Sequence, residues 1–335
     1  MHINFVMAHM YHVKYFMPLI IAARKRNIEP RVFTFYRKAE WEKGLKSYAH
    51  PYRSMDYLKD LAKQYDFEYK LCDNDKDIEG LTFFGEKRGL SNVSPRKDIH
   101  KVVLTCLRDF ADDPYPNNWY DNYIGKVDNV VLVSEFFAKH YGKISPKNLY
   151  LGASKYDVEL DAAQIKKDLK INGEKIALVV PPELVYVKQI NLNKVYDMLH
   201  SMGYSIITKA RMKDSLPQNV RGEKYFEDFS WFPHDTMQLI KVANVVVTFD
   251  SGVSKECVML DTPFVNLHVY DYTPFSFFFK YDFCRNLPLH INPKELCDII
   301  GSLDSMDWSE EFVKAREEFL FESGHVSENI LDALL

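Results

Sequence analysis

Short runs of apolar residues, each followed by a stretch with helical periodicity, recur along the chain and constrain its fold more than any other feature. A typical run is Val245-Val246-Val247, which precedes a predicted helix over 253–260. Continuous apolar runs of this length are typical of parallel strands covered on both faces. Further strands are predicted at 3–8, 31–36, 67–71, 101–104, 129–133, 176–180, 205–208 and 264–267. Further helices are predicted over 13–26, 55–64, 192–202, 236–242, 293–302, 309–321 and 328–331. This alternation predicts an α/β protein.

The alternation stops in a polar junction at 150–157 and restarts at Ile176. The chain has 335 residues, about twice the ~150 residues of an average domain. We therefore expect two Rossmann-like domains facing a central cleft, residues 1–152 and 153–335. This prediction leaves open whether the last helix packs on the C-terminal or on the N-terminal domain.

Charge and cysteine content exclude several classes of protein. The net charge is −4, and the basic residues are interspersed with acidic ones, so no nucleic-acid-binding surface is expected. The five cysteines form no CxxC pair, which indicates reduced thiols used as core residues. The N-terminus lacks the pattern of a signal peptide, and no run of about 18 apolar residues could span a bilayer. We expect a cytoplasmic protein.

An aromatic run at 273–279 has two interpretations. It could touch a membrane or a lipid-linked acceptor, or it could form a buried aromatic cluster. We favour the buried cluster, so membrane contact is expected to be peripheral at most.

The strongest local motif is Asp250-Ser251-Gly252, which joins the apolar strand at 245–248 to a helix. Free backbone N–H groups and the helix dipole at such a turn bind anions, and ligands of open α/β sheets lie at the carboxyl ends of the strands. The alternative is an ordinary strand-to-helix turn in which a serine is the N-cap.

Residues 243–267, ANVVVTFDSGVSKECVMLDTPFVNL, resemble a block of the GT-B glycosyltransferase superfamily. The block is found in enzymes related to UDP-N-acetylglucosamine 2-epimerases and to CDP-glycerol or teichoic-acid-type transferases. Segments 133–136, 150–157 and 324–330 are similar to other parts of the same proteins. The resemblance implies a nucleotide-sugar site in the second domain, an acceptor site in the first and a base in the cleft.

The resemblance also implies roles for individual residues of the second domain. Ser251, Gly252 and Ser254 would hold the donor diphosphate. Lys209 and Arg211 follow the strand at 205–208, where a cation could neutralise the departing phosphate, although the family often has His-Pro near that position. Asp250, Glu183 and Glu256 would contact the nucleotide or the sugar. For Lys209 and Arg211 the alternative is a solvated basic loop, and for Glu183 it is a rigid loop.

In the first domain the resemblance points to a histidine after the first strand. His9 or His12 would accept the proton of the attacking hydroxyl, since imidazole titrates near neutral pH. The alternative is a helix-capping or surface histidine. Arg108 and Asp109 follow another strand and would face the cleft or the acceptor, although a salt-bridged structural pair is favoured.

No metal site is expected. Asp73-Asn74-Asp75 has the Asp-x-Asp pattern of metal-dependent glycosyltransferases, but we favour a solvated loop. No cofactor is expected beyond the nucleotide sugar as co-substrate. The sequence thus predicts a metal-independent glycosyltransferase of polysaccharide biosynthesis that transfers a sugar to a hydroxyl of a glycan or lipid-linked acceptor. The alternatives are a nucleotide-sugar 2-epimerase and a non-catalytic nucleotide-sugar or glycan-binding protein.

Overall fold

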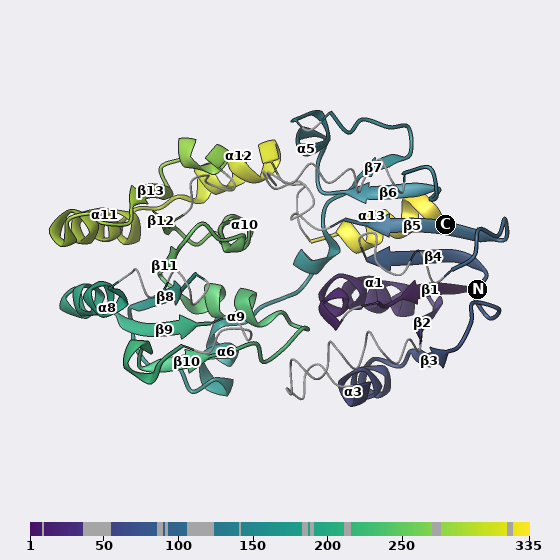
Figure 1. The fold of residues 1–335 in the computed structure, drawn as a ribbon, viewed down its shortest axis with the longest axis horizontal. Coiled ribbons are helices and arrows are strands. Elements are labelled where there is room, and N and C mark those ends of the chain that lie inside the picture. The colour runs from purple at the N-terminus through teal and green to yellow at the C-terminus, as the bar shows by residue number, and fades with distance from the viewer. Residues whose placement is uncertain are drawn as a thin grey trace. The chain divides into compact units, whose positions relative to one another are not determined.

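The chain forms two compact units (Figure 1). The first unit comprises Met1–Val158 and Glu318–Leu335, and the second comprises Glu159–Glu317. The boundary follows Val158, whereas the sequence analysis placed it after residue 152. The computed structural model describes residues 1–8, 10–35, 55–85, 90, 93–105, 124–140, 142–182, 187, 191–210, 216–269, 276–319 and 324–335.

The first unit contains a parallel sheet of seven strands in the order β3-β2-β1-β4-β5-β6-β7. Its strands are β1 (His2–Val6), β2 (Glu29–Phe35), β3 (Glu68–Cys72), β4 (Gly80–Gly85), β5 (Ile99–Leu104), β6 (Asn129–Leu132) and β7 (Asn148–Tyr150). Its helices are α1 (Val13–Lys25), α3 (Met55–Tyr65), α5 (Glu135–His140) and α13 (Val326–Leu334), with 3₁₀ turns η1 (Met10–His12) and η5 (Ser154–Tyr156). The strand order reverses between β1 and β4.

The second unit contains a parallel sheet of six strands in the order β10-β9-β8-β11-β12-β13. Its strands are β8 (Ile176–Val180), β9 (Ser205–Lys209), β10 (Lys224–Phe226), β11 (Val245–Thr248), β12 (Phe264–His268) and β13 (Cys284–Pro288). Its helices are α6 (Ala162–Asp168), α8 (Leu192–Ser201), α9 (Asp235–Val242), α10 (Val253–Met259), α11 (Pro293–Ser305) and α12 (Ser309–Phe319), the last belonging to this unit up to Glu317. The 3₁₀ turns are η6 (Gln218–Val220) and η7 (Ser276–Lys280). Here the order reverses between β8 and β11.

Both sheets are those of a Rossmann-like α/β fold, so the predicted fold class is confirmed. The central strands β8 and β11 are buried along their whole length, as expected for parallel strands covered on both faces. Helices α8 and α11 pack together and contribute to one core with β8, β9, β11 and β12. The sequence analysis missed β4, β10, β13, α5 and α6.

Helix α13 returns to the first unit, where it packs against α1 and η5. Asp157, just after η5, accepts hydrogen bonds from the backbone N–H groups of Gly324, Val326 and Ser327. These donors lie at the start of α13, where N–H groups have no partner within the helix. Asp157 therefore caps α13 from a distant part of the sequence.

We expect Asp157→Ala to lower the free energy of unfolding by about 1 kcal/mol, the usual effect of losing a helix cap. Amide hydrogen exchange should rise at Val326 and Ser327 before it rises in β1. The exposed Asp60 on α3 provides a matched control, and Asp60→Ala should change stability by less than about 0.5 kcal/mol. Unchanged exchange at both amides in Asp157→Ala would contradict this assignment.

The described cysteines are free thiols, and three of them are buried in the two cores. Burial raises the pKa of the Cys257 and Cys72 thiols, which keeps both in the thiol form. Cys106 lies outside the described residues. Their use as core residues agrees with the sequence analysis for Cys72, Cys257 and Cys284.

The aromatic run at 273–279 is described only from Ser276 onward. Phe278 is fully buried, and its ring centroid lies 4.5 Å from that of Phe277, so the prediction of a buried cluster is confirmed for Phe278. Phe277 and Phe279 are half-buried. In the described part of the chain, no helix combines the length and apolar character needed to cross a membrane.

Candidate functional site

The reversal of strand order between β8 and β11 defines the candidate site of the second unit. Thr248, the last residue of β11, pairs with Val180, the last residue of β8, so both strands end at the same edge. In open α/β sheets, ligands bind at this reversal, outside the carboxyl ends of the strands. The turn at 249–252 leaves the sheet at this edge.

Ser251 and Gly252 lie at the surface of this turn and are partly exposed. Gly252 has helical backbone angles and is the N-cap of α10, with no side-chain capping bond. The Ser251 hydroxyl accepts a long hydrogen bond of 3.4 Å from the N–H of Val253, so the alternative of a serine-capped turn stays open. Ser254 is buried, and its hydroxyl donates to the carbonyl of Ser251.

Asp250 fixes the turn to the neighbouring strand. Its carboxylate accepts hydrogen bonds from the side-chain amide of Asn266 and from the N–H of Val269, both at 2.7 Å. Its backbone φ of +47° lies in the left-handed region, which Asp tolerates better than most residues. These bonds give Asp250 a structural function that the sequence analysis did not anticipate.

Lys209, at the end of β9, forms a buried ion-pair network. Its ammonium lies 2.6 Å from Oδ1 of Asp228 and 3.5 Å from Oδ2 of Asp235, and its side chain is 5% exposed. Asp235 also accepts hydrogen bonds from the N–H groups of Phe229 and Thr236. The alternative of a solvated basic loop is therefore wrong for Lys209. Its charge is compensated by two carboxylates rather than presented to solvent.

The remaining predicted residues of the second unit are only partly described. Glu256 is buried on α10, next to the buried Lys255. Glu183 and Arg211 lie outside the described residues. Pro181 and Pro182, which precede Glu183, are buried directly after β8.

In the first unit, His12 lies at the corresponding reversal between β1 and β4. Its ring is fully buried and contacts the aromatic rings of Tyr11 and Phe16, with centroids 4.6 Å and 5.7 Å away. It also lies against Gly85, the last residue of β4. His12 occupies the N-cap position of α1 without a side-chain capping bond, and the burial of its ring excludes a surface histidine. His9, Arg108 and Asp109 lie outside the described residues.

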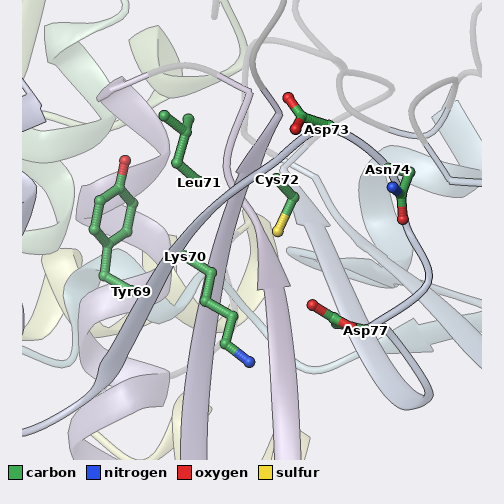
Figure 2. Close-up of a pocket in the computed structure, with 7 residues that line it drawn as sticks. All are labelled: Tyr69, Lys70, Leu71, Cys72, Asp73, Asn74 and Asp77. Atoms are coloured by element: carbon green, nitrogen blue, oxygen red, sulfur yellow. The ribbon is translucent and has the colours of Figure 1, made fainter.

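The Asp-x-Asp segment lies beside a shallow hollow of about 490 Å³ at the edge strand β3 (Figure 2). Figure 2 shows Lys70 and Cys72 on β3, with Asp73, Asn74 and Asp77 on the loop that follows. Asn74 accepts a hydrogen bond from the N–H of Lys76, and Asp75 accepts one from the N–H of Ser94. The Ser94 N–H is the main cause of the lowered pKa of the Asp75 carboxyl. Strand β3 is separated from β1 by β2, so this loop is not part of the reversal site.

Among the described residues, no group of three or more His, Cys, Asp or Glu side chains could hold a metal ion. Sequence reasoning missed Asp228, Asp235 and His268. A signal existed for His268, which directly follows the apolar run 264–267 and therefore had to lie at the carboxyl edge of the sheet.

Known proteins resemble this chain in structure and not in sequence. No family model matches the sequence, and no curated protein matches it. The wall teichoic acid polymerase TagF superposes with a TM-score of 0.67 at 10% identity, covering 99% of this chain and 88% of TagF. The UDP-GlcNAc 2-epimerase from Neisseria meningitidis, solved with bound UDP-GlcNAc, gives 0.62 at 12% identity, covering 100% and 99%. The glycotransferase of kitacinnamycin gives 0.59 at 11% identity, covering 100% and 98%. The chain has the GT-B type of fold, with two Rossmann-like α/β domains, as the sequence resemblance implied.

Proposed function

We propose that this protein is a glycosyltransferase that transfers a sugar from a nucleotide-sugar donor to a hydroxyl group. The observation that carries the proposal is the partly exposed Ser251–Gly252 turn at the reversal between β8 and β11. The turn follows β11 at the carboxyl edge of a parallel sheet, the edge at which such sheets bind phosphates. The bound UDP-GlcNAc of the structurally similar epimerase supports a nucleotide sugar as the ligand.

In the proposed reaction, the acceptor oxygen attacks the anomeric carbon of the donor, and the bond from this carbon to the diphosphate breaks. The acceptor proton passes to a histidine, and the leaving diphosphate is stabilised by the Ser251–Gly252 turn. We assign the base to His9 or His12. The His12 ring is fully buried.

No metal is required in this scheme, because protein hydrogen-bond donors stabilise the leaving group. Since the charge of Lys209 is compensated, Arg211 is the better candidate of the two for a cation near the diphosphate. In this proposal the acceptor is a glycan or a lipid-linked sugar. The reaction belongs to polysaccharide biosynthesis and takes place in the cytoplasm.

The proposal is tested by a thermal-shift screen of nucleotide sugars followed by calorimetry. A ligand that binds only the folded state should raise the melting temperature, by an amount equivalent to about 2.7 kcal/mol at a hundredfold excess over Kd. Ser251→Asp places a carboxylate in the turn and should weaken binding about tenfold or more, because it repels the diphosphate. Ser302→Asp makes the same change at an exposed position of α11 and should leave Kd unchanged. Failure of every nucleotide sugar to bind the wild type would refute the proposal.

A 2-epimerase is the second candidate, favoured by the structural similarity to the Neisseria enzyme. Incubation with the donor alone distinguishes the two. An epimerase would convert the donor sugar without an acceptor, whereas a transferase would return it unchanged except for slow hydrolysis. Donor binding with no turnover on any acceptor would indicate a non-catalytic binding protein.

A further inference from the structure

A carboxylate and an imidazole meet beside the Ser251–Gly252 turn. Thr248 pairs with Asn266 across the two strands. Asp250 and His268, which lie two residues further along the chain from each, are therefore also neighbours. Nδ1 of His268 lies 3.1 Å from Oδ2 of Asp250. The Asp250 side chain is fully buried, while that of His268 is 36% exposed. A buried carboxylate thus holds a half-exposed imidazole at the carboxyl edge of the sheet.

The position of the carboxylate is fixed from several directions. Asn266 donates to its Oδ1 and accepts a hydrogen bond from the Asp250 N–H, at 2.7 Å and 2.6 Å. The N–H of Val269 donates to Oδ2. The φ of Asp250, +47°, lies in the left-handed region. The hydrogen bonds from Asn266 and Val269 hold the carboxylate beside the His268 ring.

This geometry determines which ring nitrogen of His268 faces a ligand. An ionised carboxylate only accepts hydrogen bonds, so Nδ1 of His268 carries a proton and donates it to Asp250. Nε2 is then the ring nitrogen that can contact a bound molecule. In the imidazolium form, Nε2 also donates a hydrogen bond.

The charges at this edge favour His268 as the group that meets an anion. Between Phe249 and Val269 the basic residues are Lys255 and His268, and Lys255 is buried. Lys209 is compensated by Asp228 and Asp235. His268 is therefore the partly exposed basic side chain on the segment that contains the phosphate-binding turn.

We propose that His268 binds the diphosphate of the nucleotide through Nε2, and that Asp250 positions its ring. A charge-assisted hydrogen bond from Nε2 to a phosphate oxygen compensates the negative charge that develops when the sugar–phosphate bond breaks. The diphosphate as the bound group rests on the proposed function, whereas the orientation of the imidazole by Asp250 does not.

The test compares ligands with and without phosphates. For the base selected by the screen, calorimetry at fixed pH measures the Kd of the nucleoside diphosphate and of the nucleoside. His268→Ala should weaken the nucleoside diphosphate about tenfold or more and change the nucleoside less than about twofold. Equal losses for both ligands, or no loss for either, would overturn the proposal. His200→Ala is the matched control, because His200 also pairs with a carboxylate, Glu223 at 3.4 Å, but at the end of α8. It should change neither Kd.

A second measurement separates this inference from the proposed function. Nitrogen-15 spectra of the wild-type imidazoles, recorded with and without inorganic pyrophosphate, report on each ring nitrogen. We expect a protonated Nδ1 in His268 and a shift of Nε2 when pyrophosphate is added. If these changes occur while no nucleotide sugar binds, the diphosphate contact holds and the glycosyltransferase proposal fails. If nucleotide sugars bind and the Nε2 signal of His268 is unchanged by pyrophosphate, the contact is refuted and the proposed function stands.

Discussion

Replacement of Lys209 by methionine should lower the free energy of unfolding by about 3–5 kcal/mol, the usual cost of removing one partner of a buried ion pair. The reason is the environment of Asp235, whose side chain is 2% exposed and lies 3.5 Å from the Lys209 ammonium. Without the lysine, the buried carboxylate of Asp235 and the 25% exposed carboxylate of Asp228 both lose their ion pair with the ammonium. Urea denaturation followed by circular dichroism measures the loss.

A double-mutant cycle isolates the interaction from the general effect of changing a side chain. Lys209→Met combined with Asp235→Asn should be less destabilised than the sum of the two single variants, because the double variant has no unpaired charge on Asp235. Lys241→Met, at an exposed position of α9, should change stability by less than about 0.5 kcal/mol. A loss below about 1 kcal/mol in Lys209→Met would mean that water screens the pair.

The same variant distinguishes two roles for Lys209. A lysine that neutralised a bound diphosphate would be important for nucleotide affinity and nearly neutral for folding. A lysine that holds the segment between β10 and α9 would have the opposite profile. The distances to Asp228 and Asp235 favour the second role. We therefore expect the loss of stability to exceed the loss of nucleotide affinity when both are expressed as free energies.

The central strands could be predicted from the sequence because their burial on both faces requires apolar residues. Strands β8 and β11 are covered on both faces, so every position is apolar or nearly so. Strand β4 occupies an equally central place but was missed, because glycine stands at both of its ends and only seven residues, without a helix, separate it from β3. Strands β10 and β13 lie at sheet edges and are only partly buried, so they lack a continuous apolar run.

The location of the candidate site was predictable, but the state of its side chains was not. A serine and a glycine directly after an apolar strand necessarily lie at the carboxyl edge of the sheet. Whether Lys209 is available to a ligand depends on Asp228 and Asp235, which reach it from the segment after another strand. The pairing of Asp250 with His268 depends on the register between β11 and β12. Neither pairing leaves a pattern in the local sequence.

Gly85→Ala should lower the free energy of unfolding by about 1–3 kcal/mol, through overpacking at the reversal point of the first unit. A Cβ atom at Gly85 would lie 2.6 Å from Cγ of His12 and 2.7 Å from Cδ2 and Nδ1 of the same ring. The ring is fully buried and packs against Phe16, so it has little room to move away. Gly125→Ala is the matched control, since its Cβ would meet no atom within 4 Å. Thermal denaturation should show a clear loss only for Gly85→Ala.

The short distances indicate that residue 85 is glycine because any side chain there would collide with the His12 ring. A second substitution tests this explanation. In His12→Ala the ring is gone, so adding Gly85→Ala should cost little or even regain stability by filling part of the space left behind. Additive losses in the double variant would show that the methyl group meets some other atom. If His12 is also the base of the reaction, Gly85→Ala should reduce turnover by more than its loss of folded protein explains, because the methyl group displaces the ring from the end of β4. Activity per folded molecule, measured below the melting temperature of the variant, separates displacement of the ring from simple unfolding.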